Sequence, residues 1–219
     1  MNQYCVFCDI VSGVEPATVR YEDDEVIVFD NVLGWSRLML LAVPKEHKSQ
    51  TELWEHLGTV GRVATEQGRK YAPEGFRILS NFGGFGMQSQ PHGHLHIVDG
   101  TEPMLEVTRH PAVSTVDLVV EAGTELLRTD EAIYYEAKPL VPHSAPITAL
   151  TVPLSGVPES QDVLWHDIHE LGEDLAAVGW TSSPNGFRLL ANFPNAERTG
   201  VVERGHVHLL AGTFLGHYA

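Results

Sequence analysis

The sequence predicts an α+β protein made of two similar domains in tandem, residues 1–106 and 107–219. Three observations support this prediction: a segment of the first half returns in the second, apolar stretches of strand length flank a helical pattern in each half, and histidines occupy every second position of one apolar stretch. With 219 residues, 43% of them apolar, the chain is long enough for one large domain or two small ones.

The internal similarity extends over most of each half. GFRILSNF at 75–82 returns as GFRLLANF 111 residues later, and HGHLHIVDG at 92–100 returns as RGHVHLLAG 112 residues later. DDEVIVFDN at 23–31 resembles TDEAIYYEA at 129–137, an offset of 106, so short insertions separate the blocks. We therefore predict a tandem duplication, with residues 101–115 as the connection.

Each half carries the same elements in the same order. EVIVFD and LMLLAVP predict two strands, and a helix follows them, with Ser49 and Glu52 as a capping box. FRILSN and HLHIV predict two more strands around a glycine-rich loop. The stripes that predict the helix and its counterpart are Leu53, Leu57, Val60 and Ala64, and Leu164, Ile168, Leu171 and Leu175. Such stripes are typical of core positions, so we expect two α+β units that face each other.

The charge of the chain narrows the range of partners. A formal net charge of −15 argues against nucleic acid or an anionic membrane, because both require a basic surface. A small anionic ligand is compatible with this charge, since backbone N–H groups and imidazoles can hold phosphate locally. The longest apolar block, LMLLAV, is too short to cross a bilayer, and the first thirty residues contain no signal-peptide run. We expect a cytoplasmic protein.

Cys5 and Cys8 are the two cysteines of the chain and form a C-x-x-C motif. In a reducing compartment such a pair is a redox motif or half of a zinc site. The redox interpretation expects a βαβ context that this sequence does not supply. The alternative is that the two cysteines lie in a disordered N-terminal tail and that their thiols have no function.

His92, His94 and His96 alternate with other residues in PHGHLHIV, so a strand would place all three on one face. Imidazole is a general base, a nucleophile and a metal ligand near neutral pH. A partly exposed edge strand or satisfied core histidines would explain one such residue better than three.

Together these motifs resemble the histidine-triad (HIT) family, whose members show C-x-x-C, F-x-[DN], P-K-x-H, N-x-G and Q-S-x-x-H-x-H-x-H in this order. The matching stretches are CVFCDIVSGVEPATVRYEDDEVIVFDN, VPKEH and SNFGGFGMQSQPHGHLHIVDG, and they run through nearly all of residues 5–100. The second half resembles a diverged copy. In plan the chain resembles the duplicated galactose-1-phosphate uridylyltransferase branch, which implies antiparallel sheets joined as an intramolecular pseudo-dimer and hence a monomer.

The resemblance implies a nucleotide or nucleotide conjugate as the ligand. His94 would attack the α-phosphorus and form a nucleotidyl-histidine intermediate, while His96 would bind phosphate oxygens. The remaining implied contacts are Gln88 and Ser89 at non-bridging oxygens and the leaving group, Asn81 at the phosphate, and Asn31 at the ribose hydroxyls.

The resemblance also implies a structural Zn²⁺. Its four ligands would be Cys5, Cys8, His47 and His92, a tetrahedral Cys₂His₂ set. The second half supplies a control, because it has no cysteines, and Gly156 and Arg204 stand where the two histidines would be. All four ligands disappear together, as members of one site would.

The second half keeps only part of the catalytic set. His206, His208 and Asn192 persist, but Gly200 and Val201 replace the Q-S pair, and Ala137 replaces Asn31. We therefore expect catalysis in the first half and an impaired second site.

Three departures from the family pattern surround the expected nucleotide pocket. Leu38 and Met39 replace G-H, Met87 replaces the glycine before Q-S, and Pro91 and Gly93 flank the first histidine where apolar residues are usual. They argue against an ordinary phosphoramidase or dinucleoside polyphosphate hydrolase and leave room for a transferase. The retained His96 favours hydrolysis.

Three functions of different class thus follow from the sequence. The first is a nucleotide hydrolase. The second is a nucleotidyltransferase or phosphorylase that passes the nucleotide to phosphate or a sugar phosphate. The third is a zinc-stabilised nucleotide-binding module with little turnover, against which the retained Gln88, Ser89 and His94 argue.

Overall fold

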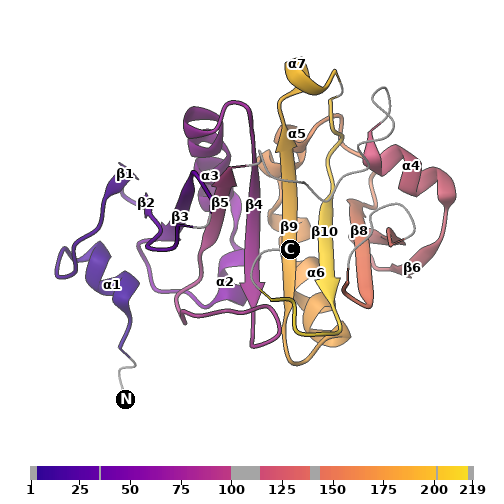
Figure 1. Cartoon of the computed structure of the whole chain (residues 1–219). Helices are drawn as coiled ribbons and strands as arrows, with labels where there is room; N and C mark the ends of the chain where they lie inside the picture. Colours follow the sequence, from indigo (N-terminus) through magenta and orange to yellow (C-terminus); the bar gives the residue numbers. More distant parts are fainter. Residues whose placement is uncertain (1–3, 35, 100–113, 139–143, 201, 217–219) are drawn as a thin grey trace.

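The computed structural model describes residues 4–34, 36–99, 114–138, 144–200 and 202–216 (Figure 1). The described residues form an α+β fold in which ten strands make one antiparallel sheet, in the order β1-β2-β3-β5-β4-β9-β10-β8-β7-β6. The strands are β1 (Val19–Glu22), β2 (Val26–Asp30), β3 (Met39–Pro44), β4 (Gly75–Phe82), β5 (Leu95–Asp99), β6 (Glu125–Arg128), β7 (Ala132–Glu136), β8 (Ile147–Pro153), β9 (Phe187–Pro194) and β10 (Val207–Ala211). The helices are α1 (Val6–Val11), α2 (Gln50–Glu55), α3 (Gly58–Tyr71), α4 (Thr115–Ala122), α5 (Gln161–His166), α6 (His169–Ser182) and α7 (Ala196–Thr199).

The two halves meet at the pair β4 and β9, in the middle of the sheet. Leu79 pairs with Leu190, which is its counterpart at the offset of 111, and the pairing continues symmetrically on both sides. Two pairs of stacked rings strengthen this seam: Phe76 with Phe193, and Phe82 with Phe187, with ring centroids 4.5 and 4.2 Å apart. The strand order on one side of the seam therefore repeats in reverse on the other.

The predicted single helix of each half is two helices, which corrects the sequence-based expectation. In the N-terminal half α2 ends before His56 and α3 begins at Gly58, while the buried Leu57 lies at the corner. The corner lets α2 pack against α6 and α3 against α5, across the seam. Trp54 and Trp165, again counterparts at the offset of 111, meet there with ring centroids 6.1 Å apart. The predicted capping box of Ser49 and Glu52 is confirmed.

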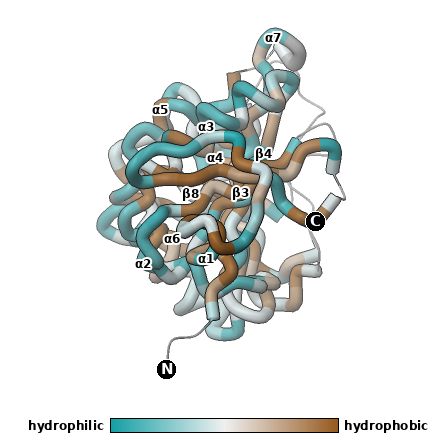
Figure 2. The backbone as a smooth tube through the Cα atoms, turned by 90° about the vertical axis from the view of Figure 1, so that its left-hand side faces the viewer, coloured by the Kyte–Doolittle hydropathy of each residue, from teal (hydrophilic) through white to brown (hydrophobic). Residues whose placement is uncertain are grey.

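Alternate side chains of the central strands enter different cores, so both faces of the sheet are covered. Val28 and Leu40 join the large core under α2, α3, α5 and α6, whereas Phe29 and Leu41 join a second core under α1. Burial on both sides explains why β3 is apolar throughout. In Figure 2 the tube is brown along much of β3 and β8, and hydrophilic colour gathers on turns of α2, α3 and α5.

Several elements differ from the prediction in position. The strand β5 begins at Leu95, so only His96 of the three histidines lies in the ladder. The exposed β1 and the short α1 were not predicted, and α1 holds the two cysteines in ordered structure rather than in a tail. Nearly all of the expected connection, 101–115, lies outside the described residues. None of the described helices has the length and apolarity needed to span a bilayer.

Candidate active site and metal centre

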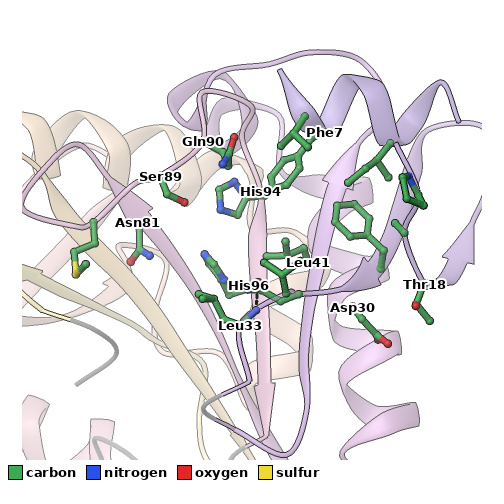
Figure 3. A pocket seen from close by; sticks show the side chains of 18 of the residues that line it. Phe7, Thr18, Asp30, Leu33, Leu41, Asn81, Ser89, Gln90, His94 and His96 are labelled. Carbon is green, nitrogen blue, oxygen red and sulfur yellow. Dashed lines mark hydrogen bonds between the residues drawn. The ribbon is translucent and has the colours of Figure 1, made fainter. Parts of the chain in front are cut away.

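A cavity of about 850 Å³ opens on the face of the sheet that carries α1. One end is apolar and is lined by Phe7, Ile10, Phe29 and Leu41. The other end is polar and is lined by Asn81, Ser89, Gln90, His94, His96 and Arg188. In Figure 3 the two imidazoles are the side chains of the polar end that lie nearest the apolar end, with Asn81 and Ser89 on one side of them and Phe7 and Leu41 on the other. The volume falls in the range of small-molecule sites.

The surroundings of His94 define its protonation state. Its Nδ1 is 2.8 Å from the carbonyl oxygen of His92, which can only accept, so Nδ1 carries the proton. Burial lowers the pKa of His94 and keeps the ring neutral. The lone pair is therefore on Nε2, in a side chain that lines the cavity. A neutral imidazole in this tautomer can act as a nucleophile.

Gln50, at the first position of α2, fixes the backbone of His94. Its Oε1 accepts from the His94 N–H at 3.0 Å, and its Nε2 donates to the His94 carbonyl at 3.1 Å. Gln50 is buried, and the same amide group lies 3.1 Å from the Ser80 hydroxyl. The backbone of His94 is thus held by a glutamine that the sequence did not single out.

His96 follows on β5, and its ring centroid lies 4.8 Å from that of His94. The pKa of His96 is well below its usual value, chiefly because the ring is buried and also because the neighbouring His94 and the charged Arg188 disfavour a second positive charge there. It is therefore a neutral imidazole beside His94. In this form one ring nitrogen can donate to a phosphate oxygen.

Asn81 lines the cavity from β4, but its side chain also serves the seam. Its Oδ1 accepts from Nε of Arg188 at 2.7 Å, because the two residues face each other in the β4–β9 register. Arg188 is completely buried and lines the cavity as well. The C-terminal half therefore contributes a cation to this site, which sequence comparison within the chain did not reveal.

The loop between β4 and β5 brings Ser89 and Gln90 to the cavity, while Gln88 faces its own loop. Gln88 accepts from the Gly83 N–H and donates to the Gln90 carbonyl, both at 3.0 Å. Its predicted contact with phosphate stays a prediction. Met87 lines the cavity with φ of 64°, the left-handed conformation that favours glycine.

Asn31 lines the cavity, beside its apolar end, just after β2. Its Oδ1 accepts from the Leu33 N–H at 3.0 Å and so shapes the turn that carries Leu33 to the cavity. The neighbouring Asp30 lines the cavity and pairs with Arg20 through two contacts of 2.7 Å. The predicted ribose contact of Asn31 agrees with this place but is not tested by it.

The four predicted metal ligands come together beside the cavity. The donor atoms of Cys5, Cys8, His47 and His92 all lie within 4.8 Å of one another. Both sulfurs are 3.6 Å from Nδ1 of His92, and Cys8 Sγ is 3.1 Å from Nδ1 of His47. Tetrahedral zinc with ordinary bond lengths places sulfur and nitrogen roughly 3.5 Å apart, so the set is compatible with zinc.

The surroundings also suit metal binding. Nε2 of His92 is 2.9 Å from the Pro44 carbonyl oxygen, so Nε2 donates and Nδ1 presents its lone pair to the cluster. Burial lowers the pKa of His92 to about 4, which keeps this ligand neutral. Burial raises the pKa of the Cys8 thiol to about 11, and a bound cation would reverse that effect by stabilising the thiolate.

In the C-terminal half an ion pair stands where the cluster stands in the N-terminal half. Ser114 and Asp117 occupy the N-cap and third positions of α4, as Cys5 and Cys8 do in α1. Arg204, the counterpart of His92, pairs with Asp117 at 2.7 Å and donates to the Val157 carbonyl at 2.8 Å. The helix is thus tied to the sheet by charge instead of by metal ligands.

His206 keeps the arrangement of His94 in part. Its Nδ1 is 2.8 Å from the carbonyl oxygen of Arg204, and its backbone N–H donates to Gln161 at 3.2 Å. Its Nε2, however, is 3.1 Å from Nε2 of His208, so the neighbouring ring engages the nitrogen that corresponds to Nε2 of His94. Both rings are completely buried. Gly200 lies in the described residues, whereas Val201 lies outside them.

Comparisons with known proteins match about half of the chain. Residues 4–110 match the family described as "Scavenger mRNA decapping enzyme C-term binding". An uncharacterized HIT-like protein of Methanocaldococcus jannaschii is 32% identical over 52% of this chain and 92% of its own length. A 14 kDa zinc-binding protein of Brassica juncea is 34% identical over 44% of this chain and 93% of its own. The adenylylsulfatase HINT1 of Arabidopsis thaliana is 33% identical over 44% of this chain and 71% of its own.

Proposed function

This chain belongs to the histidine-triad (HIT) family, and from that premise we propose that it is a nucleotide hydrolase acting through a nucleotidyl-histidine intermediate on His94. The observation that carries the proposal is the tautomer of His94, whose Nδ1–H is bound to a backbone carbonyl while Nε2 belongs to a cavity-lining side chain. Nucleophilic catalysis by histidine requires this neutral form.

The cavity supports one orientation of the nucleotide. The base would lie among Phe7, Phe29 and Leu41, because flat apolar rings suit an aromatic-lined end. Asn31 would face the ribose hydroxyls, and the phosphates would lie against Asn81, Ser89 and His96 at the polar end. This orientation puts the α-phosphorus next to His94.

In the first step Nε2 of His94 attacks the α-phosphorus, a P–N bond forms, and the leaving group departs with the electron pair of its bond to phosphorus. In the second step water attacks the same phosphorus and the P–N bond breaks. The products are a nucleoside monophosphate, a neutral His94 and a proton released to solvent. Donors aimed at the phosphorus oxygens, Ser89 and His96 among them, would stabilise the charge that develops in both steps.

A zinc ion would be held by Cys5, Cys8, His47 and His92, and its chemistry there would be structural, since four protein ligands leave no open position. It would cross-link α1 to the sheet. Because α1 carries Phe7 and Ile10 to the apolar end, this cross-link would also fix one wall of the cavity.

We also propose that the chain arose by tandem duplication and folds as an intramolecular pseudo-dimer with a single competent site. Two observations support the duplication. The strand order is mirrored about the seam, and Leu79 pairs with Leu190, its own counterpart in the other half. The engaged Nε2 of His206 supports the assignment of catalysis to the N-terminal half. A sheet edge that a single-copy relative would use for dimerisation is here paired within the chain.

The proposal is tested with a panel of nucleotide conjugates in which the α-phosphate carries a sulfate, an amine or a further nucleotide. The names of the matching proteins recommend adenosine 5′-phosphosulfate and a cap dinucleotide as members. We expect release of a nucleoside monophosphate and, after acid quenching, a nucleotide adduct on His94 by mass spectrometry. Adding inorganic phosphate separates transfer from hydrolysis, since transfer would yield a nucleoside diphosphate. Folded, zinc-loaded protein that turns over no member would refute the proposal.

A further inference from the structure

Two arginines lie at mirror positions of the β4–β9 seam, each opposite an asparagine of the other half. Nε of Arg188 donates to Oδ1 of Asn81 at 2.7 Å, and Nε of Arg77 donates to Oδ1 of Asn192 at 3.1 Å. In both cases the arginine and the asparagine are direct partners in the strand register. Both arginines are buried. As elements of the seam, the two pairs are equivalent.

Only one of these arginines belongs to the cavity. Arg188 lines its polar end together with Asn81, His94 and His96, whereas Arg77 is not among the lining residues. The guanidinium of Arg188 also donates to the Gly216 carbonyl at 2.9 Å and lies 3.5 Å from the Gly86 carbonyl oxygen. Arg188 therefore contacts three parts of the structure within the site: Asn81 in the seam, Gly86 in the loop before Gln88, and Gly216 after β10.

A guanidinium keeps its charge at every physiological pH, and its effect is strong where water is excluded. Oxygens of Asn81, Gly86 and Gly216 contact its Nε and Nη2 atoms and fix the position of the group. Its positive charge reaches the neighbouring ring, where it contributes to the lowered pKa of His96. A fixed cation at this end of the cavity favours an anionic ligand group over a neutral one.

We propose that Arg188 is a positioning residue for the site in the N-terminal half: it holds Asn81 at the polar end and sets a fixed positive charge beside the phosphate group. This inference rests on the proposed function, because it takes the ligand to be a nucleotide whose phosphate lies at that end. The C-terminal half would then contribute to catalysis through Arg188, although its own His206 and His208 are buried against each other.

The matched variants Arg188→Met and Arg77→Met test this inference, because each removes one arginine from the same kind of seam contact. The probes are AMP, GMP, CMP and UMP and the corresponding uncharged nucleosides, measured by isothermal titration calorimetry on the full chain. We expect Arg188→Met to weaken binding of the preferred monophosphate by on the order of tenfold to a hundredfold and to leave its nucleoside unchanged. Arg77→Met should change neither affinity.

Equal effects of the two variants, or an unchanged preference of folded Arg188→Met for the monophosphate, would overturn the inference while leaving the proposed function intact. Wild-type protein that binds none of the four monophosphates would refute both the inference and the proposed function. Because loss of a buried arginine can prevent folding, the variant Arg188→Lys provides a second test of the inference. It keeps the charge but lacks the planar fork, so we expect about a fivefold or greater loss of monophosphate affinity. Wild-type affinity in folded Arg188→Lys would again overturn the inference.

Discussion

The backbone carbonyl of His92 accepts the Nδ1–H of His94 at 2.8 Å, while the side chain of the same His92 faces two cysteines of the metal cluster. One residue thus joins the cluster to the proposed nucleophile. Displacement of His92 would alter the hydrogen bond that selects the tautomer of His94. Loss of metal should therefore affect turnover as well as stability.

Protein purified without added metal should contain about one zinc per chain, since the described residues hold one complete ligand set. The double variant Cys5→Ser, Cys8→Ser should lose zinc, melt at lower temperature and turn over more slowly. Inductively coupled plasma mass spectrometry and differential scanning calorimetry measure the first two effects. Full zinc content and unchanged melting in that variant would rule out the structural site.

His94→Ala should abolish both turnover and the covalent adduct, because no other described nucleophile occupies its place in the cavity. His206→Ala should keep most of the activity, since Nε2 of His206 is engaged by His208. Both variants are compared by initial rates after a circular dichroism check of folding. Equal loss of activity in folded His206→Ala would mean that the C-terminal half also catalyses.

Gln50→Ala and Gln161→Ala form a pair that separates stability from catalysis. Each removes a buried amide that accepts from the backbone N–H of a histidine, so each should lower the free energy of unfolding by about 1–3 kcal/mol. Only Gln50→Ala should also lower kcat, because it alone releases the backbone of His94. Urea unfolding and steady-state kinetics give the two quantities. A kcat that is the same in both variants would show that Gln50 has no part in positioning His94.

Met87→Gly should be more stable than Met87→Ala by about 1 kcal/mol, because both lose the long side chain but only glycine suits a φ of 64° without strain. In a chain of this size that difference corresponds to about 2–4 °C in Tm. Thermal unfolding of the two variants measures it. Alanine equal to glycine would mean that the loop at Met87 relaxes freely.

Light scattering should report a monomer near 24.1 kDa, because β4 already pairs with β9 inside the chain. The measurement is made over a range of protein concentrations. A dimer joined through the same strand edges would refute the intramolecular pairing.

The strands and the metal cluster could be predicted because their signals are local or repeated. Apolar runs located β2, β3 and β4. The resemblance to the HIT family grouped the cysteines with His47 and His92, and the joint loss of all four in the second half supported that grouping. The capping box marked the start of α2 to the residue.

Other features depend on packing that no short pattern encodes. The break between α2 and α3 follows from contacts across the seam, and the partnership of Arg188 with Asn81 follows from a strand register between halves. Gly93, an apparent departure from the family pattern, has a local cause. A side chain there would meet the Ser49 carbonyl oxygen at 2.6 Å, so the close approach of α2 requires glycine.

The seam between β4 and β9 joins two segments of one polypeptide, and this has a genetic consequence. In an assembly of two identical chains, any codon change at the interface appears on both sides of the axis at once. Here Arg77 and Arg188 are encoded separately, as are Asn81 and Asn192. Mutation can therefore alter one side while the other is conserved, so selection can act on each half on its own.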